Sequence, residues 1–101
     1  MSESQLIKKI REFLKKQPEC FFWKEHGGQY GTIGIPDVIV CYKGRLVAFE
    51  AKVGKNTTTK LQDYTIEQIR AAGGIAEIVR SVEEVEKTLR KVEDTYGDRT
   101  L

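Results

Sequence analysis

The chain lacks the features that mark membrane spans, secretory signals, disulfides and zinc sites. No apolar run approaches the roughly 20 residues that a helix needs to cross a bilayer, and the N-terminus has no apolar signal core. Only two cysteines, Cys20 and Cys41, and one histidine, His26, are present, without CxxC spacing. We therefore expect an intracellular protein without membrane contact, in which both cysteines are buried free thiols.

An excess of charge of one sign is also missing. Seventeen Lys and Arg residues oppose fifteen Asp and Glu residues, for a formal net charge of +2, so bulk charge does not identify a nucleic-acid binder. Placement is more informative, because Lys52, Lys55 and Lys60 lie in one stretch while acidic residues gather near the C-terminus. This asymmetry is typical of a basic cleft, and equally of a charged surface without a partner.

A chain of 101 residues is expected to form one domain, here residues 1–101. Its hydrophobic pattern predicts the order αβββαβα. The expected helices cover residues 3–17, residues 59 or 60 to 72, and a final segment from Val82 that begins with a capping box at residues 81–84 and precedes a tail at residues 95–101. The expected strands are residues 20–24, 38–42, 45–51 and 75–79. Gly73-Gly74 is expected to end the second helix.

The two central strands form a predicted hairpin, because only Lys43-Gly44 separates them. Both faces of this hairpin are apolar, so helices are expected on both sides of a mixed sheet in an α/β fold. The aromatic residues Phe21, Phe22 and Trp23 are expected in the core, because no basic residues alternate with them. A Gly-rich loop at residues 26–34 either cradles a phosphate or only turns the chain.

Charged residues gather at one end of this apolar hairpin. Glu50 and Lys52 lie two positions apart on one strand and therefore share a face, and the register places Asp37 opposite Glu50. Unpaired charges are costly to desolvate, so such a cluster favours a divalent cation as its partner. The alternative is that Asp37 only begins a strand and that Glu50 and Lys52 form a surface ion pair.

These residues also carry a family resemblance. Pro36-Asp37 followed by Glu50-Ala51-Lys52 resembles the PD-(D/E)XK nuclease superfamily. Together with Gly34, Gln62 and Gly73-Gly74, the pattern is similar to the VRR-NUC branch, over roughly residues 3–81. The resemblance implies a restriction-endonuclease-like αβββαβ core followed by a C-terminal helix, in a cytoplasmic protein of a bacterial cell or a phage-infected host.

The resemblance also implies roles for individual residues. Asp37, Glu50 and the backbone carbonyl of Ala51 would bind Mg²⁺, with Mn²⁺ as a substitute, and Lys52 would position or help to deprotonate the attacking water. Gln62 would bind a phosphate or orient a water, or else it is an exposed helix residue. Lys55 and Lys60 are expected to contact DNA phosphates independently of sequence.

A fourth metal ligand is expected from the first helix. At 100° per residue, Glu3 falls within the apolar stripe that faces the core, whereas Glu12 points to solvent. Glu3 is therefore the candidate ligand. Its alternative role is to complement the positive end of the helix dipole.

The function expected from this pattern is Mg²⁺-dependent hydrolysis of DNA phosphodiester bonds by an endonuclease. Small chains of this kind resemble homodimeric enzymes that cut branched DNA, including four-way Holliday junctions, whose two-fold symmetry matches that of a dimer. The alternatives are a nonspecific or restriction-type nicking endonuclease and a noncatalytic nucleic-acid-binding module on the same fold.

Overall fold

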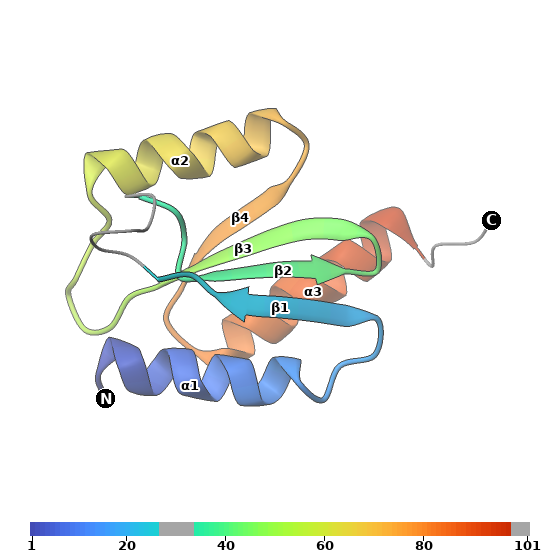
Figure 1. Cartoon of the computed structure of the whole chain (residues 1–101), viewed down its shortest axis with the longest axis horizontal. Helices are drawn as coiled ribbons and strands as arrows, with labels where there is room; N and C mark the ends of the chain where they lie inside the picture. The colour runs from blue at the N-terminus through green and yellow to red at the C-terminus, as the bar shows by residue number, and fades with distance from the viewer. Residues whose placement is uncertain (27–33, 98–101) are drawn as a thin grey trace.

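The computed structural model describes residues 1–26 and 34–97, which form a four-stranded sheet with helices packed against both faces (Figure 1). The elements are α1 (Glu3–Leu14), β1 (Cys20–Lys24), β2 (Val38–Tyr42), β3 (Arg45–Ala51), α2 (Lys60–Ala71), β4 (Ile75–Val79) and α3 (Val82–Tyr96). The predicted α/β order is confirmed, and all four strands have the predicted bounds. Most of the Gly-rich loop and residues 98–101 of the expected tail lie outside the described residues.

The sheet is mixed, with strands in the order β1-β2-β3-β4. The first three strands are antiparallel, and β4 runs parallel to β3. Lys43 and Gly44 both have positive φ, of 51° and 85°, as a two-residue hairpin turn that matches the strand twist requires. The turn pairs Val38 with Phe49, so the predicted register, with Asp37 facing Glu50, is confirmed.

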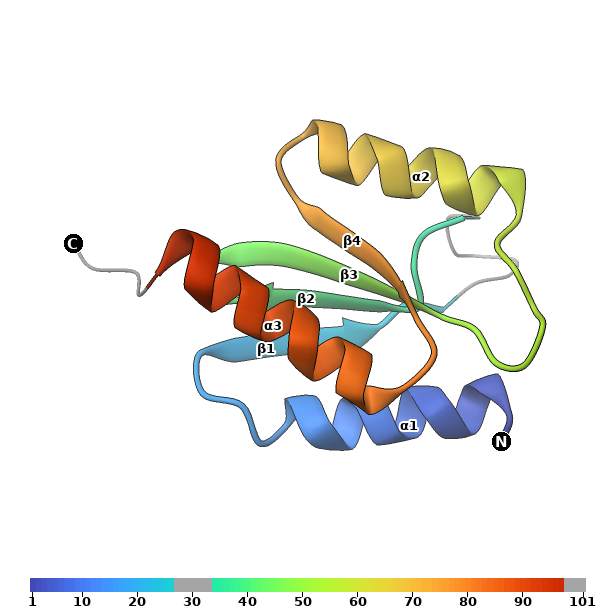
Figure 2. The same cartoon turned by 180° about the vertical axis from the view of Figure 1, so that it is seen from behind.

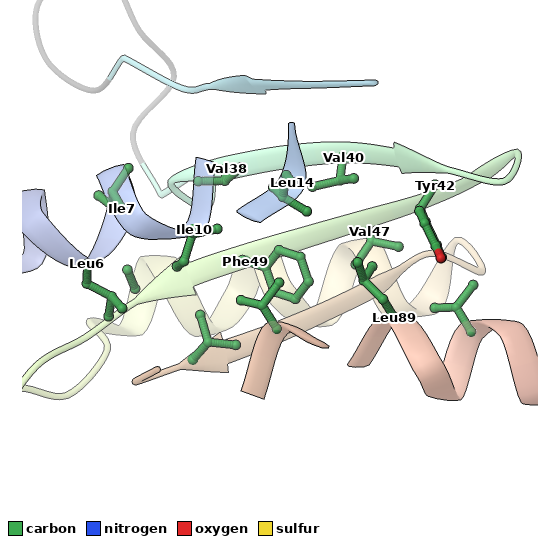
Figure 3. Close-up of a cluster of buried hydrophobic side chains, with 14 residues drawn as sticks. Leu6, Ile7, Ile10, Leu14, Val38, Val40, Tyr42, Val47, Phe49 and Leu89 are labelled. Atoms are coloured by element: carbon green, nitrogen blue, oxygen red, sulfur yellow. The ribbon is translucent and has the colours of Figure 1, made fainter. Parts of the chain in front are cut away.

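The two faces of the sheet are covered by different helices. Figure 2 shows α1 and α3 side by side on one face, while α2 lies on the other. The main core lies under α1 and α3, where Phe49 is fully buried among aliphatic side chains from the sheet and both helices (Figure 3). A smaller cluster forms under α2 from Ile39, Ala48, Ile66 and Ala76. The expected covering of both faces is thus confirmed.

Two helix ends differ from the expected ones by more than one residue, and one helix cap differs as well. α1 ends at Leu14 rather than residue 17, because the amides of Lys16 and Gln17 bond to carbonyls three residues back, ahead of Pro18. α3 extends to Tyr96, beyond the expected start of the tail. The capping box of α3 is only half formed. Ser81 accepts from the Glu84 amide, but the Glu84 carboxylate accepts from the Arg80 amide instead of Ser81.

The expected burial of β1 and Cys41 is partly wrong. Both cysteines are free thiols, but Cys41 is exposed and Cys20 is half-buried. Phe21 and Trp23 are 68% and 45% exposed, whereas Phe22 packs against the main core. The physical reason is the edge position of β1, because alternate residues of this strand point to the α2 face, and the apolar cluster under α2 draws on other strands. Among the described residues, no helix is both long and apolar enough to span a membrane.

Candidate functional site

Asp37 lies just before β2, at the end of the hairpin opposite the turn. Its Oδ2 accepts a hydrogen bond of 2.8 Å from the backbone amide of Ala51. The strand ladder between β2 and β3 ends at the Val38 and Phe49 pair, so the Asp37 side chain satisfies an amide of β3 beyond the last ladder pair. This bond orients the carboxylate toward the end of β3 that carries Glu50.

Glu50 is the most deeply buried charged residue of the site, with 2% exposure. Its Oε2 lies 3.4 Å from the Lys52 Nζ and accepts a 3.2 Å hydrogen bond from Gln62. Burial and the negative charge of Asp37 raise the pKa of Glu50 to about 7, and the Lys52 ammonium offsets part of that increase. Lys52 itself is 8% exposed, so the Glu50 and Lys52 pair is not a solvated surface ion pair.

The other carboxylate oxygen of Glu50 has no partner among the described residues. This Oε1 atom is buried and accepts no hydrogen bond. A carboxylate oxygen in that state is costly, because the free energy of its lost hydration is not recovered. An unsatisfied oxygen beside a second carboxylate is an environment that suits a bound cation.

Gln62 connects the site to the start of α2. Its Oε1 accepts from the Thr59 amide, and the Thr59 hydroxyl accepts from the Gln62 amide, which completes a capping box. The side-chain amide of Gln62 then donates to Glu50. Gln62 is therefore a half-buried residue that holds Glu50, rather than the exposed helix residue of the alternative interpretation.

Gly34 brings the segment that leads to Asp37 against the first turn of α2. It has a φ of 90°, and a Cβ at this position would lie 2.8 Å from the Leu61 side chain and 3.1 Å from the Leu61 carbonyl oxygen. Only glycine allows this approach without strain. As a result, the segment before β2, the end of β3 and the start of α2 meet at one place.

Comparison with known proteins gives structural relatives only. No protein-family model matches the sequence, and no curated protein matches it. Among solved structures, one described as a "VRR_NUC domain" superposes with a TM-score of 0.70 at 22% identity, over 87% of this chain and 94% of the other. A "VRR_NUC domain protein" superposes with a TM-score of 0.69 at 17% identity, over 100% and 98%.

The chain has the VRR_NUC fold. The predicted resemblance is thus confirmed at the level of the fold, and superposition over almost the whole length of both chains includes the segments that carry Asp37, Glu50 and Lys52.

Within the VRR_NUC fold, the residues present suit a hard divalent cation. Asp37 and Glu50 offer carboxylate oxygens, which Mg²⁺ prefers, and the unsatisfied Oε1 of Glu50 is an available ligand atom. The Ala51 amide is engaged with Asp37, and the role of the Ala51 carbonyl stays a prediction. Among residues 1–26 and 34–97, no three His, Cys, Asp or Glu side chains gather in one place to hold an ion.

Glu3 does not join the carboxylate pair in this structure. The predicted helix phase is confirmed, because Glu3 is half-buried and Glu12 is exposed. Glu3 Oε2 accepts a 3.1 Å hydrogen bond from Asn56, in the loop that follows Lys52. Glu3 therefore borders the site through that loop, and its role as a ligand stays a prediction.

Two residues of this region were not expected from the sequence. Arg80 donates to the carbonyls of Gly54 and Asn56, at 3.0 Å and 2.7 Å, and Asn56 in turn binds Glu3. Together they hold the exposed loop of residues 53–59, which joins β3 to α2. Neither has a local sequence signal, whereas the capping box Thr59-x-x-Gln62 matches the sequence pattern Ser/Thr-x-x-Glu/Gln.

Lys55 and Lys60, the predicted phosphate contacts, are exposed on and beside this loop.

Proposed function

We propose that this chain is a divalent-metal-dependent endonuclease that hydrolyses phosphodiester bonds in DNA. The observation that carries the proposal is the buried Glu50, which lies beside Asp37 and Lys52 and has one oxygen without a partner. A noncatalytic DNA-binding module would gain nothing from two carboxylates at its binding surface, because they repel phosphate. The likeness to VRR_NUC domain structures supports the same chemistry.

Each residue of the site has a task in this reaction. A bound Mg²⁺ would supply Lewis-acid activation of water and neutralisation of charge on the phosphate. Asp37 and Glu50 would hold the ion, and the Ala51 amide and the Gln62 side chain keep the two carboxylates in place. The Lys52 ammonium would face the scissile phosphate from beside Glu50 and stabilise the negative charge that develops there.

The proposed substrate is branched DNA, and the proposed active form is a homodimer. The described part of one chain contributes one such site, whereas a four-way junction must be cut on two strands related by a two-fold axis. A C2 dimer presents two sites with that symmetry. The exposed Lys55 and Lys60 would bind the DNA backbone around each site without reading its sequence.

Three substitutions test the catalytic assignment. We expect Asp37→Asn, Glu50→Gln and Lys52→Ala each to lower the cleavage rate by about 10²-fold or more, because each removes a group that acts on the transition state. The measurement is Mg²⁺-dependent cleavage of labelled DNA, with circular dichroism to verify folding.

Removal of the metal ion by EDTA should abolish cleavage by the wild type. Undiminished cutting in excess EDTA would defeat the proposal, and Asp94→Asn is the matched control because Asp94 is an exposed carboxylate in the last turn of α3.

A further inference from the structure

The outward face of α1 is strongly basic. Four exposed cations lie on this helix and at its C-terminal cap, namely Lys8, Lys9, Arg11 and Lys15, and a fifth, Lys16, follows the cap directly. At 100° per residue they share the side opposite the buried stripe of Leu6, Ile10 and Leu14. Glu12 is the single acidic residue among them.

These cations are not neutralised within the described part of the protein. None of the five forms an ion pair with a described residue. The like charges of Arg11 and Lys15 are four residues apart, a spacing at which they repel each other. An anionic partner would relieve this repulsion.

The helix beside α1 has the opposite character. α3 covers the same face of the sheet (Figure 2), but its own cation Arg90 is paired with Glu86. Five acidic residues accompany three basic ones along this helix: Glu83, Glu84, Glu86, Glu93 and Asp94 against Lys87, Arg90 and Lys91. The basic surface on this side of the molecule therefore belongs to α1.

α1 begins at the rim of the proposed active site, and the first cation of its outward face, Lys8, lies five residues further along the helix. Glu3, the first residue of α1, binds Asn56 in the loop that follows Lys52. Figure 1 shows the start of α1 beside that loop, with the rest of the helix running away from it. From Lys8 to the C-cap Lys15, the cations span about 10 Å at 1.5 Å per residue, which matches about three phosphate steps of one strand of duplex DNA at 3.4 Å each.

We propose that the outward face of α1 binds the sugar-phosphate backbone of the duplex arm that flanks the cleaved bond. This inference rests on the proposed nuclease function and adds the direction in which the substrate leaves the site. The contacts are electrostatic and independent of sequence, because lysine and arginine side chains on one helix face meet the phosphates as point charges.

Two double variants test this inference against a matched control. Lys8→Gln with Lys15→Gln removes one stripe of the face, and Lys9→Gln with Lys16→Gln removes the other. Lys87→Gln with Lys91→Gln removes the same charge from exposed positions of α3. Dissociation constants for a fluorescent duplex and a fluorescent four-way junction are measured in Ca²⁺ over a range of NaCl concentrations, and melting curves verify folding.

We expect at least one α1 variant to weaken binding about tenfold or more near 0.1 M salt, and to reduce the slope of log K against log salt by about 0.9 per lost contact. Cleavage at saturating DNA should keep its rate. The α3 control should stay within about twofold of the wild type, with an unchanged slope. The inference would be overturned if both α1 variants kept the wild-type salt slope, or if the α3 control weakened DNA binding as much as the α1 variants do. In either case, a wild type that cuts DNA would still be a nuclease. A wild type that neither binds nor cuts DNA would overturn the proposed function as well.

Discussion

At the scale of single residues, the two oxygens of Glu50 have different environments. Oε2 is held by Lys52 and Gln62, whereas Oε1 is buried without a partner. Such an atom lowers the stability of the metal-free protein, and a bound cation would reverse the loss because it binds the folded state. This is the pattern expected where stability is given up for function.

The raised pKa of Glu50 predicts how stability depends on pH without metal. Its pKa rises from 4.5 in the unfolded chain to about 7 in the folded protein, so the folded state binds the proton more tightly. Stability is therefore fully present below the unfolded value and is lost as the pH rises through about 7. In EDTA, we expect the melting temperature of the wild type to fall relative to Glu50→Gln between about pH 5 and pH 8.

Near pH 8 in EDTA, the melting temperatures of the wild type and Glu50→Gln should differ by about 4 °C or more, which corresponds to roughly 1 kcal/mol in a protein of this size. Adding Mg²⁺ near pH 8 should raise the melting temperature of the wild type but not that of the variant. Parallel pH dependences in EDTA would show that Glu50 does not titrate in this range.

Gln62 has two tasks that substitutions can separate. Gln62→Ala removes both the cap and the bond to Glu50, and we expect a loss of about 1 kcal/mol in the free energy of unfolding and about 10- to 100-fold in activity. Gln62→Glu keeps the capping box but places a negative charge beside Glu50. In Mg²⁺, the free energy of unfolding of Gln62→Glu should stay closer to the wild-type value than that of Gln62→Ala. The Mg²⁺ concentration that Gln62→Glu requires for cleavage should differ from that of the wild type. Metal titrations of cleavage and melting curves provide the measurement, and full activity in both variants would remove Gln62 from the site.

At the scale of elements, the loop of residues 53–59 is held from two sides. Arg80, just before α3, binds two of its carbonyls, and Glu3 of α1 binds Asn56. The amide of Lys52 also continues the pairing with β4 by donating to Val79. The end of β3 and the start of α2 are thereby fixed in relation to each other, which a site divided between Glu50 and Gln62 requires.

Arg80→Ala should loosen this loop without unfolding the domain. We expect faster amide hydrogen exchange at residues 53–59 and a several-fold loss of cleavage activity, with a melting temperature within a few degrees of wild type because Arg80 is exposed. Arg90→Ala is the matched control, since it removes a surface ion pair with Glu86 far from the loop in sequence. Unchanged exchange in Arg80→Ala would mean that the two carbonyl bonds do not order the loop.

At the scale of the whole molecule, the site lies at one end of the sheet, opposite the hairpin turn, and residues 1–26 and 34–97 of this 11.5 kDa chain contain one such site. Two cuts on a symmetric junction need two sites in a fixed arrangement. We therefore predict a homodimer that prefers four-way junctions to linear duplex and cuts them at symmetry-related positions.

Light scattering at micromolar protein concentration gives the mass in solution. Competition between a labelled junction and excess unlabelled duplex then gives the preference, and binding should weaken as salt rises. A strict monomer that cuts both substrates equally would support the nonspecific nicking endonuclease instead.

The sequence by itself determined the secondary structure and the neighbours within the hairpin. Side-chain alternation, a two-residue turn and helix caps are local signals, so all four strands and the meeting of Asp37 with Glu50 could be predicted. The same local rules failed at the end of α1, where hydrogen bonds three residues back replaced the helical pattern before Pro18.

Only the tertiary structure decided what each of these residues contacts. The bonds of Arg80 to Gly54, of Asn56 to Glu3 and of Gln62 to Glu50 join positions 26, 53 and 12 residues apart, and no local pattern encodes such pairs. The exposure of Phe21 and Trp23 likewise depends on which part of the sheet α2 covers. A side chain's burial and partners are properties of the packed elements together, so they arise only when the helices have docked on the sheet.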